Sequence, residues 1–179
     1  MAIDANMIGR LLRGAVKAFG KLQRSSAPPR PHRGRGGAAV QGPDLSSAYP
    51  GDFRGTARIA YAPKPDGEAD PGEVVWTWVP YEEDYSQGKD RPVLLVGHNG
   101  GRLLALMMTT RDRNNGEHHD ADYVDVGTGP WDRQRRPSEV KLDRILQVDP
   151  RDIRREGAVL AKTAFDRVAE ALRRRHGWN

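Results

Sequence analysis

The chain has no cysteine among its 179 residues, which excludes disulfides and cysteine metal ligands and is typical of a cytoplasmic protein. It also has no long hydrophobic run, since no apolar stretch approaches the roughly 20 residues that a membrane-spanning helix needs. Arg10, Arg13 and Lys17 interrupt the apolar residues near the N-terminus, so no signal peptide is expected. Hydrophobic residues make up 37% of the chain, which suffices for one folded domain with appendages.

The positive charge is concentrated in the first part of the chain. Residues 1–48 contain eight Lys/Arg and two Asp/Glu, whereas residues 49–179 contain 21 and 22. Residues 1–24 have the pattern of a basic amphipathic helix, and residues 25–48 have the Pro, Gly and Arg content of a disordered linker. We therefore expect three parts, of which residues 49–179 form the folded domain.

The apolar residues of segment 3–24 recur every three or four positions, with basic residues between them. A helix of this kind suits weak contact with an anionic membrane or a nucleic acid, or the groove of a partner protein. Packing of the helix on its own domain is an equally open alternative.

Several short segments rich in β-branched and aromatic residues predict strands. We expect these strands near residues 56–61, 74–79, 93–96, 103–108, 123–126 and 139–148. Asn99-Gly100 predicts a hairpin between the third and the fourth of them, and residues 161–175 have the apolar periodicity of a helix. Short strands with tight turns and one closing helix predict a mainly β protein, a small barrel or curled antiparallel sheet.

Arg91 follows Trp76 by fifteen positions, and the segment between them predicts a strand, a polar loop and the start of the next strand. Pro92 is expected to fix Arg91 at the junction of loop and strand. The guanidinium of arginine is always charged and presents a fork of donors, which suits an RNA phosphate. An ordinary surface salt bridge is the alternative, and the spacing alone leaves both open.

Five segments, taken in order, resemble the MazF/PemK family of toxins from bacterial toxin–antitoxin pairs. They are Gly72-Glu73-Val74-Val75-Trp76, Gln87-Gly88-Lys89-Asp90-Arg91-Pro92-Val93, Leu106-Met107-Met108-Thr109-Thr110, Val140-Lys141-Leu142-Asp143-Arg144-Ile145 and Gly157-Ala158-Val159-Leu160. The resemblance covers about residues 70–175. It implies an SH3-like barrel, a homodimer, and a metal-independent endoribonuclease that cuts single-stranded RNA and is neutralised by an antitoxin protein.

The resemblance also assigns site residues, with Arg91 and Thr109 at the positions of the family's catalytic arginine and threonine. Arg91 would stabilise charge on the phosphate and Thr109 would donate its hydroxyl to a phosphate oxygen, so that cleavage leaves a 2′,3′-cyclic phosphate and a 5′-hydroxyl. Without the resemblance, an ordinary threonine at the end of a strand would be the favoured interpretation of Thr109. Ser86 stands where the family usually has an acidic residue, and the connection between the second and third strands of the resembled fold is short, which bears on sequence preference.

Further contacts to RNA are expected around this pair. Gln87 and Lys89 belong to the polar loop, which we expect to be a flexible lid, and Thr110 and Arg111 follow Thr109. Trp131 is a candidate for stacking on a base, and a packed core position or a dimer contact is equally open.

Glu117-His118-His119-Asp120 contains residue types that bind metals, but it follows the turn-forming Asn114-Asn115-Gly116. Adjacent histidines of a strand point to opposite faces, so a solvated turn is expected here rather than a metal site. No phosphate-binding or dinucleotide motif is found, and no cofactor is expected. The alternative to a nuclease is a non-catalytic SH3-like module that binds RNA or a protein partner.

Overall fold

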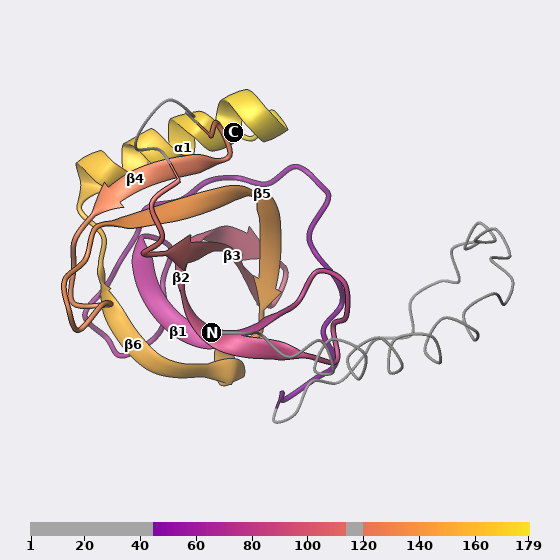
Figure 1. Ribbon diagram of the computed structural model, residues 1–179. Coiled ribbons are helices and arrows are strands. Elements are labelled where there is room, and N and C mark those ends of the chain that lie inside the picture. The colour runs from indigo at the N-terminus through magenta and orange to yellow at the C-terminus, as the bar shows by residue number, and fades with distance from the viewer. Residues whose placement is uncertain (1–44, 114–119) are drawn as a thin grey trace, which may run out of the picture. The chain divides into compact units, whose positions relative to one another are not determined.

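The computed structural model describes residues 45–113 and 120–179, which form a six-stranded antiparallel sheet and one long helix (Figure 1). The strands are β1 (Glu73–Pro80), β2 (Gly88–Asn99), β3 (Arg102–Thr109), β4 (Tyr123–Gly127), β5 (Ser138–Val148) and β6 (Ile153–Val159), and the helix is α1 (Lys162–His176). The sheet has the order β4-β5-β3-β2-β1-β6 and curls without closing, so β4 and β6 are its edges within the described part of the chain. The predicted mainly β class and SH3-like curled sheet with a C-terminal helix are confirmed.

The central strands are buried on both faces, which explains their continuous apolar runs. Along β2, Leu94 and Val96 pack with α1 and the residues around it, whereas Val93 and Leu95 pack into a second cluster on the other face. Side chains alternate between the two faces of a strand, so the residues of both clusters are buried only if other parts of the chain pack on each face of the sheet. Helix α1 covers one face next to β4 and β5, as Figure 1 shows.

The predicted hairpin joins β2 and β3. Asn99 pairs with Arg102, and the turn between them is Gly100-Gly101, in which Gly100 has a φ of 59°. This left-handed conformation favours glycine. The strands predicted near 74–79, 103–108, 123–126 and 139–148 and the helix predicted at 161–175 are likewise present.

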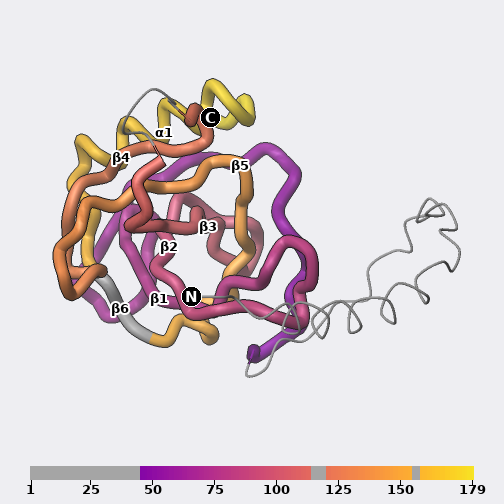
Figure 2. The backbone as a smooth tube through the Cα atoms, viewed as in Figure 1, coloured from indigo at the N-terminus to yellow at the C-terminus, as the bar shows by residue number. Residues whose placement is uncertain are grey.

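The predicted strand at 56–61 is wrong. Only Ile59 pairs there, through an isolated bridge to Gly97 that the N–H of Ala60 closes by donating to Val96. The N–H of Ile59 itself donates to Asn179, so the pairing does not extend into a ladder. Residues 45–62 instead form an irregular segment that lies along the sheet beside β5, which we call the strap (Figure 2).

The beginning of the strap overlaps the segment expected to be a disordered linker. The N–H of Ser46 donates to Asp152 at 2.7 Å and Arg102 donates to the hydroxyl of Ser47 at 2.8 Å. Residues 45–48 are therefore held on the domain by hydrogen bonds to residues distant in the sequence. The helix expected at 3–24 and the rest of the linker lie outside the described residues.

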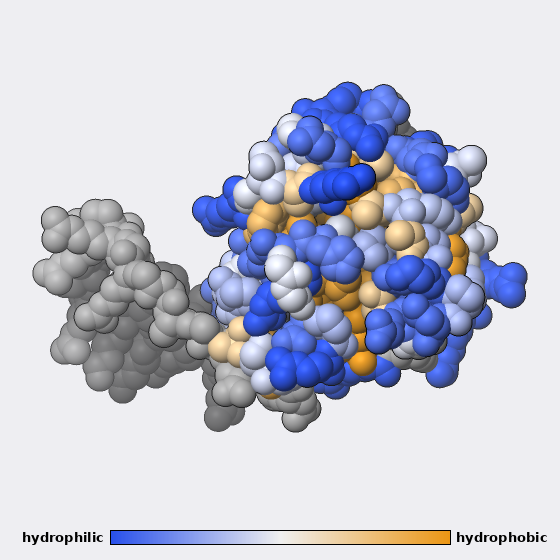
Figure 3. All heavy atoms as spheres, turned by 180° about the vertical axis from the view of Figure 1, so that it is seen from behind, coloured by the Kyte–Doolittle hydropathy of each residue, from blue (hydrophilic) through white to orange (hydrophobic). Residues whose placement is uncertain are grey.

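The surface of the described domain is mostly polar. Seen from behind in Figure 3, hydrophilic side chains cover most of the face, with a strip of hydrophobic atoms between them. Val159, on edge strand β6, is 54% exposed and is the large hydrophobic residue that stands out within the described ranges. In this part of the chain we find no helix with the length and apolar character to span a membrane.

Candidate active site

A hollow of about 210 Å³ lies where β2 begins and β3 ends, next to β1 and the segment before β5. Four of the seven predicted site residues line it: Arg91, Thr109, Thr110 and Trp131. The other residues around it are Trp76, Asp90, Pro92, Met108, Asp132, Arg136 and Ser138. The structure thus brings together the two predicted catalytic residues, which lie on different strands and are 18 positions apart in the sequence.

Arg91 lies inside β2, not at a junction of loop and strand as predicted. Strand β2 begins at Gly88, since its first residues pair with β1, and Arg91 pairs with Thr77. Pairing of β2 with β3 begins only at Val93, so Pro92 lies where β2 has a single neighbour and its missing N–H is tolerated. Arg91 is half-buried, and its guanidinium has no hydrogen bond or ion pair among residues 45–113 and 120–179.

Thr109 is the last residue of β3 and is half-buried. Its Oγ1 accepts the backbone N–H of Arg111 at 3.0 Å, which closes a tight turn. The hydroxyl proton of Thr109 remains available, because the oxygen acts as the acceptor in this bond. The turn therefore orients Thr109 without consuming its ability to donate.

The segment after this turn is fixed by Glu139, which pairs with Thr109 across β3 and β5 and is 4% exposed. Both carboxylate oxygens of Glu139 accept the N–H of Arg113 at 3.1 Å. A buried carboxylate that binds backbone N–H groups holds the loop where it leaves the strand.

Two ion pairs border the hollow and occupy the charges around Arg91. Asp132 accepts from Arg136 at 2.8 Å, and the bonds from the side chain and backbone of Arg136 lower the pKa of Asp132 to about 2. Asp90 lies 3.5 Å from Arg154. With both carboxylates paired to arginines, the Arg91 guanidinium is left as a site for an anion.

Trp131 lines the hollow but is 5% exposed and belongs to the core. Its Nε1 donates to Ser138 Oγ at 3.0 Å, which holds the ring in place. This position favours the packed-core alternative over stacking on a base. Trp76, which the sequence reasoning did not select, lines the same hollow from β1 and is more exposed. Trp76 lies on β1, two strands from Thr109 on β3, and this proximity follows from the order of the strands, which the sequence does not show.

Gln87, Lys89 and Arg111 do not line the hollow. Gln87 belongs to the β1–β2 loop (residues 81–87), and its Nε2 donates to Asp84 at 2.8 Å. The hydroxyl and N–H of Ser86 donate to the same carboxylate, and these bonds lower the pKa of Asp84. The loop that we expected to be a flexible lid is therefore folded around one carboxylate. Lys89 and Arg111 are exposed at its border and at the turn after Thr109.

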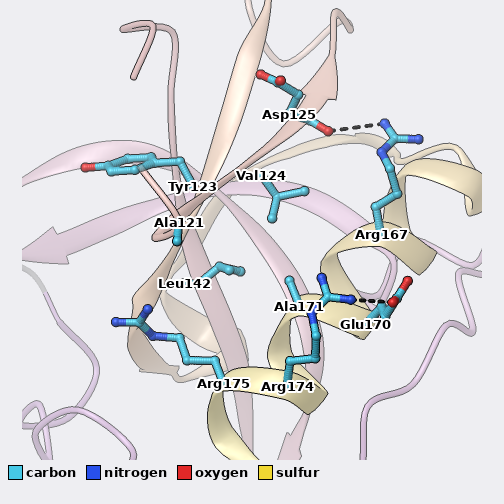
Figure 4. Close-up of a pocket in the computed structure, with 10 residues that line it drawn as sticks. All are labelled: Ala121, Tyr123, Val124, Asp125, Leu142, Arg167, Glu170, Ala171, Arg174 and Arg175. Atoms are coloured by element: carbon cyan, nitrogen blue, oxygen red, sulfur yellow. Dashed lines mark hydrogen bonds and ion pairs between the residues drawn. The ribbon is translucent and has the colours of Figure 1, made fainter. Parts of the chain in front are cut away.

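A second hollow, of about 640 Å³, lies between β4 and α1 (Figure 4). Its arginines are engaged: Arg167 donates to the carbonyl oxygen of Asp125 at 3.2 Å, Arg174 pairs with Glu170, and Arg175 pairs with an aspartate before β4. Because these guanidiniums already have partners, this hollow is a weaker candidate for binding an anion than the hollow at Arg91.

Within the described ranges, no three His, Asp or Glu side chains converge on a point where a metal ion would bind. Glu117, His118 and His119 lie outside these ranges, and Asp120 is exposed.

Three of the solved structures that are similar to this fold are weakly related to the chain in sequence. MazF of Deinococcus radiodurans is 24% identical, with a TM-score of 0.47, and the match covers 63% of this chain and 99% of that one. A MazE–MazF crystal structure from the same organism is 22% identical, with a TM-score of 0.45, covering 63% and 98%. The Mycobacterium tuberculosis toxin MazF-mt6 is 19% identical, with a TM-score of 0.42, covering 60% and 98%.

Among curated protein sequences, none is significantly similar to this chain. A family model does match, over residues 70–175. The matched range contains Arg91, Thr109 and every other residue of the hollow, and it spans more than half of the chain. The chain belongs to the PemK-like, MazF-like toxin family of type II toxin–antitoxin systems.

Proposed function

We propose that this protein is a toxin that cuts single-stranded RNA without a metal ion and leaves a 2′,3′-cyclic phosphate and a 5′-hydroxyl. Toxins of this family are generally endoribonucleases. The observation that carries the proposal for this chain is the juxtaposition in one hollow of the Thr109 hydroxyl and the Arg91 guanidinium, which has no partner among the described residues.

The chemistry needs little beyond these groups, because RNA supplies its own nucleophile. The 2′-hydroxyl loses its proton to water as its oxygen attacks the neighbouring phosphorus, the bond from phosphorus to the 5′-oxygen breaks, and the 5′-oxygen takes up a proton from water. Negative charge grows on the two remaining phosphoryl oxygens during the attack. Arg91 stabilises that charge with fixed donors, and Thr109 donates to one of the oxygens and holds it in line. Arg91 does not act as a base, since an arginine stays protonated.

The rim of the hollow supplies the contacts that hold the strand. Thr110 and Trp76 line it directly, and Trp76 offers an aromatic face to a base. Lys89 and Arg111 are exposed nearby and contact phosphates on either side of the cleaved one. Gln87 reaches a base only after it leaves Asp84. Trp131 supports the site from the core.

The partner that follows from this family is an antitoxin protein. An acidic segment that folds on binding would cover the hollow and pair with Arg91, which blocks RNA. The Deinococcus radiodurans MazF was crystallised with MazE. We further propose that the toxin acts in the cytoplasm as a homodimer.

The experiment is a cleavage assay on a panel of single-stranded RNAs with the native chain, Arg91→Ala and Arg58→Ala. Arg58 is exposed and remote from the hollow, so its variant is the matched control. We expect cleavage by the native chain and by Arg58→Ala only, with Arg91→Ala folded as judged by circular dichroism. Binding of RNA without cleavage by any of the three proteins would refute the nuclease and favour a non-catalytic binding module.

A further inference from the structure

We propose that the strap holds the β1–β2 loop over the sheet beside the Arg91 hollow, and that Asp52 is the residue that positions it for RNA binding. The inference rests on the proposed nuclease function, since it concerns how RNA reaches that site. The strap, residues 45–62, precedes the range 70–175 that matches the family. It is therefore a feature of this chain that the family match does not cover.

The contact between strap and loop is built around Arg144 of β5, whose side chain is 9% exposed. Its Nε donates to Asp52 of the strap at 2.8 Å, and its Nη1 donates to the carbonyl oxygen of Pro80 at 2.6 Å. Pro80 is the last residue of β1, so Arg144 ties the strap to the point where the loop begins.

A second set of contacts reaches into the loop itself. The other carboxylate oxygen of Asp52 accepts the hydroxyl of Tyr49 at 2.6 Å. The ring of Tyr49 meets that of Tyr85 edge-on, with 5.1 Å between the centroids, and the Arg144 guanidinium lies 5.8 Å from the centre of the Tyr85 ring. Burial and the bond to Asp52 raise the pKa of Tyr49, so this hydroxyl stays a donor. The loop residue Tyr85 is thus held between the strap and β5.

The loop is attached next to the proposed site. Glu82 accepts from Lys141 of β5 at 3.1 Å. Lys141 is two residues from Glu139, and residues two apart share a face of the sheet. Glu139 is in turn the cross-strand partner of Thr109. The loop therefore crosses the face of the sheet that carries Thr109, and its position decides how a nucleic-acid strand enters.

Removal of Asp52 would release this arrangement. The buried guanidinium of Arg144 would lose its counter-charge, and an unpaired buried charge moves toward water when it can. The bonds to Pro80 and the contact with Tyr85 would then loosen. A loop that is ordered before RNA binds lowers the entropy cost of binding, so the strap acts on affinity and leaves the chemical step unchanged.

The test uses the full chain, four single variants and the double variant Asp52→Ala/Tyr85→Ala. Asp52→Ala removes the strap's side of the contact between strap and loop, and Tyr85→Ala removes the loop's side. The ring of Tyr85 is only half-buried, so its loss should leave the domain folded. Asp52→Asn keeps an oxygen acceptor and serves as the conservative rescue. The matched control is Asp66→Ala, since Asp66 is exposed and bonds to the N–H of Glu68 in its own turn.

Two readouts separate positioning from a merely structural role. A glutamate-specific protease cuts the loop after Glu82 or Glu83, which reports the tether without any RNA. Steady-state kinetics give KM and kcat separately. We expect Asp52→Ala and Tyr85→Ala each to raise the rate of loop cleavage about tenfold and KM about fivefold, with kcat unchanged. The double variant should be no worse than either, and Asp52→Asn, which keeps an acceptor but not the counter-charge, should recover only part of the loss.

Loop cleavage at the native rate in both alanine variants would overturn the tether. A faster loop cleavage with an unchanged KM, or a loss confined to kcat, would overturn the role in RNA binding. If the native chain cuts no RNA, the proposed nuclease function is contradicted but the role of the strap is not. The protease assay, together with the affinity for an RNA carrying 2′-deoxy substitutions, would still decide this inference.

Discussion

Arg91 and Thr109 line one hollow beyond the point where the pairing of β2 with β3 ends. The pairing of these strands runs Leu95–Ala105, Leu94–Leu106 and Val93–Met107, and the same register carried two residues further sets Arg91 against Thr109. No ladder pair is formed at that level between β2 and β3 in the described chain, and both residues line the hollow. The parted strand ends give an anion access to both side chains at once.

The first prediction concerns the planar guanidinium of Arg91 and its pair of parallel donors. Arg91→Lys keeps the charge but loses the planar pair of donors, so we expect kcat to fall by about a hundredfold with the fold unchanged, in line with the loss of one transition-state donor. Single-turnover cleavage of a short RNA measures the effect. Cleavage at the native rate would show that a point charge suffices and would exclude a bidentate contact with the phosphate.

Thr109 allows a matched comparison of side chains with the same shape. Thr109→Val removes the donor and also the acceptor for the N–H of Arg111, whereas Thr109→Ser keeps both. We expect Thr109→Val to lower kcat about a hundredfold and Thr109→Ser to stay within about tenfold of the native value. The same single-turnover assay applies. Equal losses in the two variants would mean that the methyl group matters and the hydroxyl does not.

The ion pair between Asp132 and Arg136 should make the stability of the folded state depend on pH. The pKa of Asp132 is lowered to about 2 by the bonds from Arg136, so this carboxylate is charged well below its ordinary range. A lowered carboxylate pKa stabilises the folded state above the unfolded pKa of about 4, and that stabilisation is lost as the pH falls toward the folded value.

Arg136→Gln should therefore raise the titration midpoint of Asp132 toward its ordinary value, as followed by carbon NMR of the carboxyl group. Arg133→Gln changes an exposed neighbour in the same turn and should leave the midpoint in place. A midpoint that does not move in Arg136→Gln would mean that the ion pair does not form in solution.

The contacts of the strap indicate how many N-terminal residues can be removed without loss of stability. A chain that begins at Leu45 retains Tyr49 and Asp52 and should melt at the native temperature. A chain that begins at Arg54 lacks both, so Arg144 loses its counter-charge and the core loses the buried ring of Tyr49. We therefore expect a loss of roughly 3–5 kcal/mol in the free energy of unfolding. Urea unfolding of the two chains measures the difference. Equal stabilities would mean that the strap does not contribute to the folded state.

Elements with strong local signals could be predicted from the sequence. The hairpin followed from Asn99-Gly100, and α1 followed from its apolar face. Strand β6 escaped prediction because it is an edge strand that pairs only with β1, so its sequence does not need the apolar run of a buried strand. The strap escaped because no local pattern encodes it: Ser46 bonds to Asp152, 106 residues away.

The candidate site was predictable to a lesser degree. Arg91 was singled out by the proline that follows it and by its fork of donors, whereas Thr109 was selected only through the family resemblance. Their common hollow follows from a register that the sequence does not display. Trp131 illustrates the limit most clearly, since its burial depends on the bond to Ser138 and on packing in the core. Trp76 was overlooked because a tryptophan in a strand predicts burial as readily as contact with a ligand.

The most direct test of the central claim is to identify the ends that the native chain leaves on RNA in excess EDTA, with Arg91→Ala as the comparison. We expect 2′,3′-cyclic phosphate and 5′-hydroxyl ends from the native chain and no new ends from the variant. Cleavage that stops in EDTA, new ends that carry a 5′-phosphate, or undiminished cleavage by Arg91→Ala would contradict it.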